Sequence, residues 1–354
     1  MDELTIYTKA ADIWEVMYAD CAKAQSSIEF EQYILMDDAA GQRFLDLFIE
    51  KAKAGVLVRL MLDSIGSRDL LLSPRLSALR EAGGVVHFFN PIRMKTILSP
   101  RKWLPRNHVK TLLIDGKLGY TGSACMWDMM RDWHDVQARF TGALADEVKR
   151  YFIHLWAEAE FKPMPSVPFT PVSGGFSYVV TQFGVRPNRI YRELLRGIDA
   201  AKKSVCIVTP YFLPPWMLRH ALRRAVRRGV DVRVMVSEKS DVGIADYVSR
   251  SYYPPLFRAG VRIFHYQPTV LHAKYVVIDD SWATIGSTNM DYLSLMQNRE
   301  ANIFADDLGV AAKISADFEA CLKDCVEVNM AYYRRLGGWK RTLGFLGRGM
   351  RRIL

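Results

Sequence analysis

The sequence is poor in cysteine and lacks any long apolar run. Its five cysteines among 354 residues include no Cys-x-x-Cys pair and no Cys/His cluster with zinc-like spacing. No stretch of about 18 consecutive apolar residues is present, and the acidic N-terminus at Met1–Leu4 lacks the apolar core of a secretory signal. We therefore expect reduced thiols, a cytosolic location and no spanning helix, so that any membrane association would be peripheral.

Acidic residues are also fewer than basic ones. The chain has 38 Asp and Glu against 48 Lys and Arg, which gives a net charge of +10. A basic surface favours nucleic acid, phosphorylated ligands or acidic membranes, and charge alone does not choose among them. Half of the residues are apolar, which is enough for the core of one large or two medium domains.

The sequence repeats itself. Residues 26–66 predict a strand, a helix and a second strand, and the same order returns over residues 203–236. Residues 79–91 are then echoed by residues 256–268. So long a period indicates a duplicated domain rather than a solenoid, and alternating strands and helices indicate α/β layers.

A proline-rich segment separates the two copies. Residues 162–171 hold four prolines, and two glycines follow at Gly174 and Gly175. Such a composition is typical of a linker or surface crossing. We therefore expect an N-terminal half at residues 1–170 and a C-terminal half at 171–333, followed by a tail at 334–354.

Each half carries one His-x-Lys-x4-Asp motif, followed by a Gly-Ser pair. The motif residues are His108, Lys110 and Asp115 in the first half and His272, Lys274 and Asp279 in the second; the serines are Ser123 and Ser287. The spacing of two places each histidine and its lysine on the same side of a strand. Imidazole can attack phosphorus or protonate a leaving alkoxide, and lysine can neutralise phosphate oxygens. One histidine cannot do both jobs in one step, but two on opposite sides of a phosphate can.

A single motif of this kind is usually incidental. Here the whole constellation recurs with the same internal spacing and in register with the domain repeat, which favours a functional reading. Together these features resemble the phospholipase D superfamily, whose members carry the signature HxKxxxxD followed by GSxN twice. The resemblance covers nearly the whole chain, and within the superfamily it is strongest to bacterial cardiolipin synthases. The second half extends the superfamily match through Ser294 and Asn298–Glu300. The features that suggest the synthases are Tyr33, Asp63–Ser67, the Asn-His-x-Lys opening at Asn107, Trp133–Val136, Thr209–Phe212 and Asn289–Asp291.

The resemblance implies an α/β fold of two phospholipase D-like domains, each a mixed β-sheet flanked by helices. One active site would be shared at their pseudo-twofold interface. It also implies ping-pong transfer, with His108 as the nucleophile that forms a phosphohistidine and His272 as acid and then base. The residues that would hold the phosphate are Lys110, Lys274 and Asn289, supported by Ser123 and Ser287. The two histidines and two lysines cover the nucleophile, acid and charge, so no metal or cofactor is required.

An acid downstream of each motif would orient a histidine ring, and Asp135 and Glu300 fit this place. The alternative for Asp135 is a surface salt bridge. Asp115 and Asp279 belong to the candidate catalytic motifs, although within them we expect these two to fix the strand and its neighbouring loops more than to act on substrate. The halves also differ, because Cys125 stands where the family has an asparagine such as Asn289. A thiol replaces a side-chain amide poorly, which puts a phosphate contact there in doubt.

The tail from Arg334 to Leu354 has seven basic residues and no acid. Its apolar residues recur at steps of three and four: Leu336, Trp339, Leu343, Leu346, Met350 and Ile353. This pattern predicts a basic amphipathic helix suited to an anionic bilayer, and the alternative is that the stripe packs on the protein. Five glycines lower its helix propensity, which would let it order only on lipid.

The first half has an insert at residues 92–106 whose basic, apolar and Trp residues suit a lipid-facing rim.

The resemblance leads us to expect a cardiolipin synthase, a phosphatidyltransferase with phosphatidylglycerol as acceptor. It would act peripherally at the cytoplasmic face of the bacterial inner membrane. Its partners would be anionic phospholipids rather than nucleic acid, and its oligomeric state stays open. The alternatives are a hydrolytic phospholipase D, a nuclease or nucleic-acid binder of the same superfamily, and a binding protein that has lost the chemistry.

Overall fold

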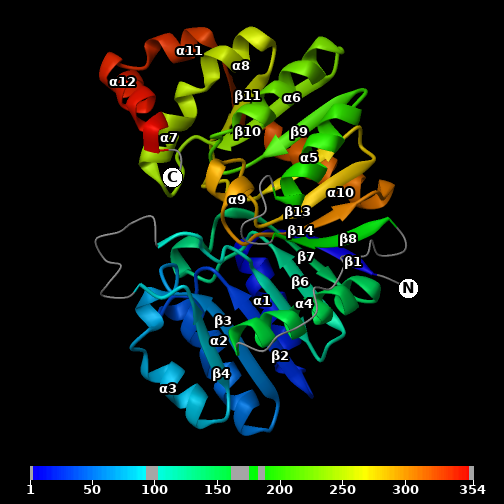
Figure 1. Ribbon diagram of the computed structural model, residues 1–354, viewed down its shortest axis with the longest axis vertical. Helices are drawn as coiled ribbons and strands as arrows, with labels where there is room; N and C mark the ends of the chain where they lie inside the picture. The colour runs from blue at the N-terminus through cyan, green and yellow to red at the C-terminus, as the bar shows by residue number, and fades with distance from the viewer. Residues whose placement is uncertain (1–2, 93–102, 161–174, 182–187, 351–354) are drawn as a thin grey trace.

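The computed structural model describes residues 3–92, 103–160, 175–181 and 188–350 (Figure 1). The linker boundary predicted near residue 170 and most of the insert before His108 lie outside these ranges. The elements of the first half are β1 (Leu4–Lys9), α1 (Ala10–Ala22), β2 (Ser27–Gln32), α2 (Ala39–Lys53), β3 (Leu57–Asp63), α3 (Pro74–Glu81), β4 (Val85–Phe89), β5 (Thr111–Ile114), β6 (Leu118–Gly122), β7 (His134–Phe140) and α4 (Ala143–Ala159).

The second half repeats this series and adds to it. Its elements are β8 (Phe176–Val180), α5 (Arg189–Ala200), β9 (Ser204–Val208), α6 (Trp216–Arg227), β10 (Asp231–Ser237), α7 (Gly243–Ser251), α8 (Tyr253–Ala259), β11 (Arg262–Tyr266), β12 (Tyr275–Ile278), β13 (Trp282–Gly286), α9 (Tyr292–Met296), β14 (Ala301–Ala305), α10 (Leu308–Leu322), β15 (Cys325–Val328), α11 (Met330–Arg335) and α12 (Gly338–Gly347). Helices α7, α9, α11 and α12 and strand β15 have no counterpart among the α-helices and strands described for the first half.

The two sheets have the same strand order. The first sheet runs β1-β7-β6-β5-β2-β3-β4, and the second runs β8-β14-β13-β12-β9-β10-β11 with β15 added at its edge. In both sheets three strands are parallel, β2-β3-β4 and β9-β10-β11, while the remaining neighbours are antiparallel. The predicted fold class, a duplicated α/β domain with two mixed sheets flanked by helices, is therefore confirmed.

Equivalent glycines end equivalent helices in the two halves. Gly55 follows α2 and Gly229 follows α6, and their φ angles are +87° and +86°. Glycine adopts this left-handed conformation without the steric cost that a Cβ brings. Both glycines therefore turn the chain into the strand that follows.

The halves share a core where the sheets meet. One buried cluster joins Val109 and Phe140 of the first half to Tyr178 and Ile303 of the second. Parallel bridges also pair Asn107 with Arg299 and His134 with Leu271 across the interface. Figure 1 shows the first half below and the second above. The interface thus brings the two motifs together.

The tail differs from the single helix that the sequence predicts. The chain leaves the helical conformation at Leu336, so α11 ends at Arg335 and α12 begins at Gly338. Among the described residues of the predicted apolar stripe, Trp339 and Leu346 are 64% and 68% exposed, so these two side chains lie largely in solvent. Instead, Gly344 and Gly347 are the buried residues of α12. Residues 351–354 lie outside the described part of the chain.

Candidate active site

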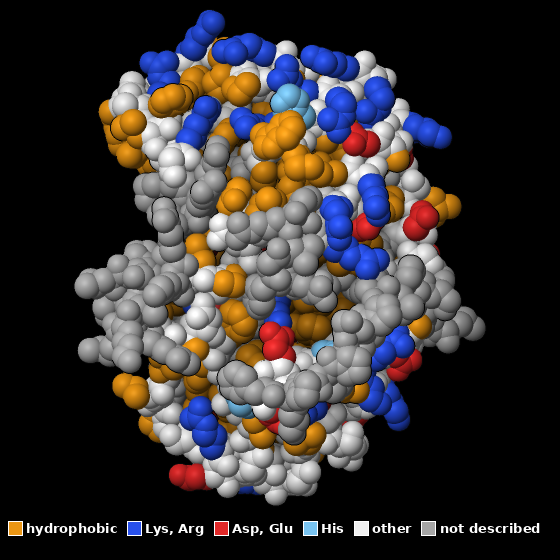
Figure 2. All heavy atoms as spheres, in the orientation of Figure 1, with side chains coloured by type: hydrophobic (Ala, Val, Ile, Leu, Met, Phe, Trp, Pro, Cys, Tyr) orange, Lys and Arg blue, Asp and Glu red, His pale blue; other side chains and the backbone are white. Residues whose placement is uncertain are grey.

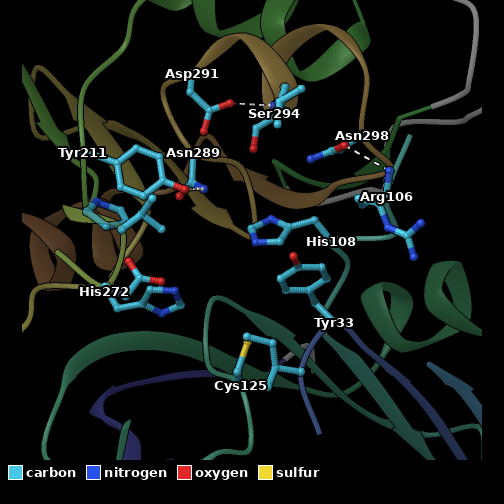
Figure 3. Close-up of a pocket in the computed structure, with 15 residues that line it drawn as sticks. Tyr33, Arg106, His108, Cys125, Tyr211, His272, Asn289, Asp291, Ser294 and Asn298 are labelled. Atoms are coloured by element: carbon cyan, nitrogen blue, oxygen red, sulfur yellow. Dashed lines mark hydrogen bonds between the residues drawn. The ribbon is translucent and has the colours of Figure 1, made fainter. Parts of the chain in front are cut away.

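The two motifs reach one cavity from opposite halves. His108 and Lys110 lie in an extended segment just before β5, and His272 and Lys274 lie just before β12, rather than inside the strands. Both histidines line a cavity of about 230 Å³. Figure 3 shows their rings approaching the cavity from different segments, with Asn289 and Cys125 also on its wall. The repeat therefore supplies one shared pocket instead of two separate ones.

Each histidine is oriented by an acid from the other half. Nδ1 of His108 lies 3.0 Å from the Glu300 carboxylate, and Nδ1 of His272 lies 2.8 Å from Oδ2 of Asp135. The sequence associates each acid with the motif that precedes it, and the structure corrects this to a crossed pairing. A ring that donates from Nδ1 leaves Nε2 as the nitrogen for substrate. The surface salt bridge considered for Asp135 is also wrong, since this side chain is fully buried.

The Gly-Ser pairs hold these acids. Ser123 donates to Asp135 and Ser287 donates to Glu300 through their hydroxyl groups. Neither serine is on the cavity wall, so their geometry supports the histidine–acid pairs rather than a direct phosphate contact. Gly286, which precedes Ser287, packs so closely that an added Cβ would overlap the Ala301 carbonyl oxygen. Only glycine leaves room for the neighbouring strand at that point.

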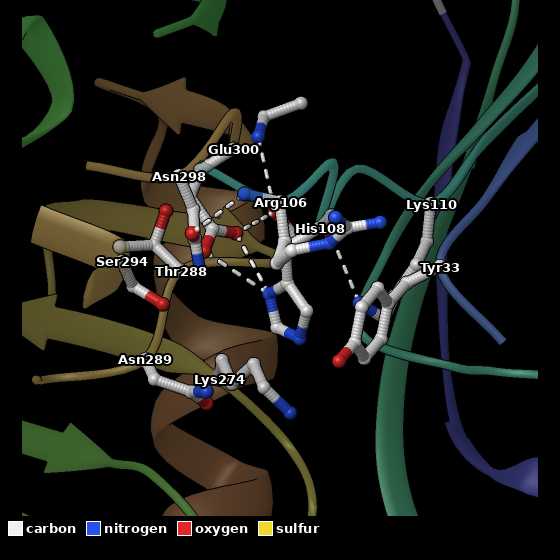
Figure 4. A network of polar contacts seen from close by, with 12 residues as sticks. Tyr33, Arg106, His108, Lys110, Lys274, Thr288, Asn289, Ser294, Asn298 and Glu300 are labelled. Atoms are coloured by element: carbon white, nitrogen blue, oxygen red, sulfur yellow. Dashed lines mark hydrogen bonds and ion pairs between the residues drawn. The ribbon is translucent and has the colours of Figure 1, made fainter. Parts of the chain in front are cut away.

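The two lysines lie beneath the histidines. Nζ of Lys110 donates to the His108 carbonyl at 2.8 Å, and Nζ of Lys274 donates to the His272 carbonyl at 2.6 Å. Both side chains are buried, and Lys110 also lies over the ring of Tyr33. Burial lowers the pKa of Lys274 to about 8. Figure 4 shows the ends of both lysines directed to the space beside His108, where they concentrate positive charge.

The histidines have different electrostatic surroundings. Burial, together with the charges of Lys110 and Lys274, places the pKa of His108 well below its ordinary value. Burial and Lys274 also lower the pKa of His272, but Asp135 opposes that shift. His108 therefore favours the neutral form, whereas Asp135 supports a positive charge on His272.

The orienting acids are unequal in the same way. Burial alone would raise the pKa of Asp135, but the charge and hydrogen bond of His272 outweigh it and lower the pKa to about 2. Burial dominates at Glu300 and raises its pKa to about 7, although Lys110 and the Ser287 hydroxyl oppose it. His272 therefore faces a firmly ionised carboxylate, whereas His108 faces one that can take up a proton near neutral pH.

Asn289 and Cys125 make the cavity wall asymmetric. Nδ2 of Asn289 donates to the Tyr211 hydroxyl at 3.2 Å, and its Oδ1 is buried without a hydrogen-bond partner among the described residues. The Cys125 thiol lines the same cavity, and burial raises its pKa. A neutral thiol offers only a weak hydrogen bond, so the amide side of the wall belongs to the second half.

Asp115 and Asp279 lie away from the cavity. Asp115 accepts backbone N–H groups of Gln25, Ser26 and Ser27, and Asp279 accepts those of Lys202, Lys203 and Ser204. Both have positive φ angles, +52° and +54°, at the turn after their strands. These contacts tie β5 to β2 and β12 to β9, so these two motif residues fix strands and loops and do not touch the cavity.

Several wall residues carry no motif signal of their own. The cavity is also lined by Tyr33, Arg106, Tyr211, Asp241, Asp291 and Asn298. Arg106 is held by Asp63, with Nη2 at 2.8 Å from Oδ1, and its backbone N–H donates to Asn298. Tyr33, Tyr211, Asp291 and Asn298 fall in segments that carry the family resemblance, but nothing in the sequence singles out Asp241. Asp241 reaches the cavity wall because the loop between β10 and α7 returns to it.

One other cluster has atoms spaced for a metal ion. Ligand atoms of His134, Asp317 and Cys321 lie within 4.8 Å of one another. Nε2 of His134 lies 3.1 Å from Asp317, which also accepts a hydrogen bond from the Tyr275 hydroxyl at 2.8 Å. Hydrogen bonds among these side chains account for the arrangement without an ion. The cluster lies between the halves, where the His134 carbonyl also accepts the backbone N–H of His272.

Comparisons with known proteins agree with the duplicated fold. The family described as "Cardiolipin synthase, PLD-like domain" matches residues 18–156 and 194–322, so the chain belongs to that family. A probable cardiolipin synthase, YwiE of Bacillus subtilis, is 32% identical over 92% of this chain. The major cardiolipin synthase ClsA of the same organism is 31% identical over 90% of it. The chain spans 66% and 68% of the lengths of these two relatives.

Solved structures show the same fold in other enzymes. The phosphatidylserine synthase of Haemophilus influenzae matches with a TM-score of 0.75 at 15% identity, covering 99% of this chain and 93% of that one. The polyphosphate kinase of Porphyromonas gingivalis matches with a TM-score of 0.64 at 14% identity, covering 96% and 53%. At such identities these likenesses carry the fold alone. The family resemblance drawn from the sequence motifs is confirmed.

Proposed function

We propose that the chain is a phosphatidyltransferase that makes cardiolipin through a covalent phosphohistidine. The observation that carries this proposal is the pair of histidines on one cavity. Each ring contacts a carboxylate of the opposite half, and each histidine carbonyl accepts a hydrogen bond from the lysine of its own motif. This arrangement offers a nucleophile, an acid and positive charge around one phosphate. Membership of the cardiolipin synthase family favours lipid phosphodiesters as the substrate class.

In the first step, Nε2 of His108 attacks the phosphorus of a phosphatidyl donor. A P–N bond forms, the P–O bond to the headgroup alcohol breaks, and His272 gives that alcohol a proton. Glu300 accepts the Nδ1–H of His108 and stabilises the positive charge that the ring gains. Lys110 and Lys274, buried behind the cavity wall, offset the negative charge of the phosphate, and the Asn289 amide on the wall donates a hydrogen bond to a phosphate oxygen.

In the second step, phosphatidylglycerol replaces the departed alcohol. His272, now neutral, takes the proton of a glycerol hydroxyl, and the oxygen attacks the phosphorus. The P–O bond of cardiolipin forms while the P–N bond to His108 breaks. Asp135 stabilises the imidazolium that forms at His272, which suits a carboxylate whose pKa is about 2.

The unequal acids support the choice of His108 as nucleophile. A nucleophilic imidazole must be neutral, and burial with two lysine charges keeps the pKa of His108 low. A ring that alternates between acid and base needs a firmly charged partner, and Asp135 provides that for His272. The opposite assignment would place the ionised carboxylate beside the nucleophile.

A turnover assay tests the reaction class. Purified protein is incubated with vesicles of labelled phosphatidylglycerol and, separately, with labelled single-stranded DNA. We expect cardiolipin and glycerol from the lipid and intact DNA. Phosphatidic acid as the main product would replace the transferase proposal with a hydrolytic phospholipase D, and cleaved DNA with untouched lipid would replace it with a nuclease.

We propose that the protein acts peripherally at the cytoplasmic face of the inner membrane. Among the described helices, none is long and apolar enough to cross a bilayer. All five cysteines are free thiols, which persist in a reducing compartment. Protease added to intact spheroplasts should leave the chain uncut, whereas protease added after lysis should degrade it. Cleavage in intact spheroplasts would contradict this location.

A further inference from the structure

Helix α12 docks on α7 through its glycine face. A Cβ added at Gly344 would overlap the carbonyl oxygen of Tyr247, and one added at Gly347 would meet a methyl group of Val248. Glycine weakens an exposed helix, so glycines at this contact are explained by the close approach that they permit. The same glycines that reduce the helix propensity of the tail therefore fix its orientation.

Arginine and aromatic contacts strengthen this docking. Nε of Arg348 donates to the Ser251 hydroxyl at 2.9 Å, and the guanidinium lies 4.6 Å from the ring centroid of Tyr252. The ring of Trp339 lies 5.9 Å from that of Tyr247. The orientation of α12 is thus set by contacts on one side of the helix and at its end.

The docking leaves the large apolar side chains of α12 facing solvent. Trp339, Phe345 and Leu346 are 64%, 65% and 68% exposed, and Leu343 is exposed beside them. The helix neighbours Arg334, Arg335 and Arg341 are also exposed, and the chain has no acid from Met330 to Leu354. Figure 2 shows hydrophobic side chains where α12 lies in Figure 1, with Lys and Arg side chains near them.

Helix α7 connects this surface to the cavity. Asp241 and Val242 line the cavity, and α7 begins directly after them at Gly243. The helix that carries the exposed apolar face is therefore packed on the element that leaves the cavity wall.

We infer that the exposed face of α12, made of Trp339, Leu343, Phe345 and Leu346 with the arginines beside it, is the surface that binds an anionic phospholipid bilayer. Aromatic and aliphatic side chains enter the acyl boundary, and the arginines pair with lipid phosphates. A second copy of this chain fits less well, because a twofold contact would set these basic residues against each other. The inference rests on the proposed function for the choice of lipid, but the binding test requires no turnover.

Vesicle co-sedimentation of the full chain tests the surface. The native protein is compared with the triple variant Trp339→Ala/Phe345→Ala/Leu346→Ala and with Leu308→Ala, which alters a 70% exposed leucine on α10. With vesicles containing phosphatidylglycerol, we expect at least tenfold weaker binding for the triple variant and native binding for the control. Pure phosphatidylcholine vesicles should bind the native protein much more weakly.

Charge and activity measurements separate this inference from the proposed reaction. Arg341→Glu should weaken binding to the anionic vesicles several-fold, whereas Lys117→Glu, the same charge change at an exposed residue before β6, should not. The triple variant should keep native turnover on a short-chain soluble phosphatidylglycerol. If the native protein also fails to turn over the short-chain phosphatidylglycerol, the proposed reaction is contradicted. The vesicle-binding comparison would still test the surface of α12.

Native vesicle binding by the triple variant would overturn the inference. So would equal binding of the native protein to anionic and neutral vesicles. If the native protein is a dimer in solution and the triple variant is a monomer with unchanged vesicle binding, the surface is instead a contact between two copies.

Discussion

The two halves of the molecule share a strand order but not their additions. A His-x-Lys segment precedes β5 in the first sheet and the equivalent β12 in the second. An acid lies at the start of β7 in the first sheet and just before the equivalent β14 in the second. The first half has Asp135 and Cys125 where the second has Glu300 and Asn289. The second half alone adds α7, α11 and α12 among the described elements. Duplication therefore supplies paired groups, and local differences assign them different tasks.

Removing either histidine should have the largest effect. His108→Ala and His272→Ala should each lower turnover about 10³-fold or more, because each loses a step that the other half cannot supply. After rapid quenching in alkali, which preserves a P–N bond, label from a phosphatidyl donor should be attached to the native protein and not to His108→Ala. His220→Ala, at an exposed histidine on α6, is the matched control. Full activity in either single variant would contradict a shared site.

The orienting acids should rank next, and unequally. Asp135→Asn should lower kcat about 10²-fold or more, since an amide would favour the wrong tautomer of His272 and remove a firm charge. Glu300→Gln should cost about tenfold less, because the raised pKa of Glu300 leaves part of it protonated near neutral pH already.

Steady-state kinetics at pH 6.5 measures this difference. Asp132→Asn, an exposed acid near Asp135, is the control and should keep native rates. A larger loss from Glu300→Gln than from Asp135→Asn would reverse the roles proposed for the two histidines.

The pH profile should expose the same asymmetry. Burial raises the pKa of Glu300 to about 7, so its carboxylate is lost, and activity falls, as the pH drops through about 7. Burial lowers the pKa of Lys274 to about 8, so its ammonium is lost, and activity falls, as the pH rises through about 8. Glu300→Gln should remove the acid limb, and Lys274→Arg should move the alkaline limb upward. A profile unchanged in both variants would refute this assignment.

Restoring symmetry at Cys125 should have the smallest effect. Cys125→Asn places a second amide on the cavity wall opposite Asn289, and one added hydrogen bond of about 1 kcal/mol would lower KM up to about fivefold. Asn289→Ala should raise KM instead. Cys325→Ser, at a thiol outside the cavity, is the control. An increase in KM for Cys125→Asn would indicate that the wall fits a thiol better than an amide.

Much of this arrangement could be predicted from the sequence because it is local or repeated. The spacing of His108 and Lys110 recurs at His272 and Lys274, and two copies of one motif are strong evidence for one function. The glycines at Gly55 and Gly229 end helices through their own backbone freedom, which requires no distant partner. The fold class and the family follow from these patterns.

Other features depend on contacts between distant segments. Sequence order suggests that Glu300 serves His272, but the interface places it on His108, 192 positions away. The glycines of α12 lower its helix propensity, and only the packing on Tyr247 and Val248 shows what they permit. Asp241 reaches the cavity because a loop folds over it, and the sequence has no pattern for that.

The sequence by itself determined the duplicated fold, the two histidines with their lysines, and the strand-fixing roles of Asp115 and Asp279. Those depend on side-chain chemistry and on spacings within one strand or turn. The tertiary structure alone decided which acid serves which histidine and which face of α12 meets solvent. Both depend on how two halves or two helices pack, and packing is set by the sum of many contacts between segments far apart in the chain.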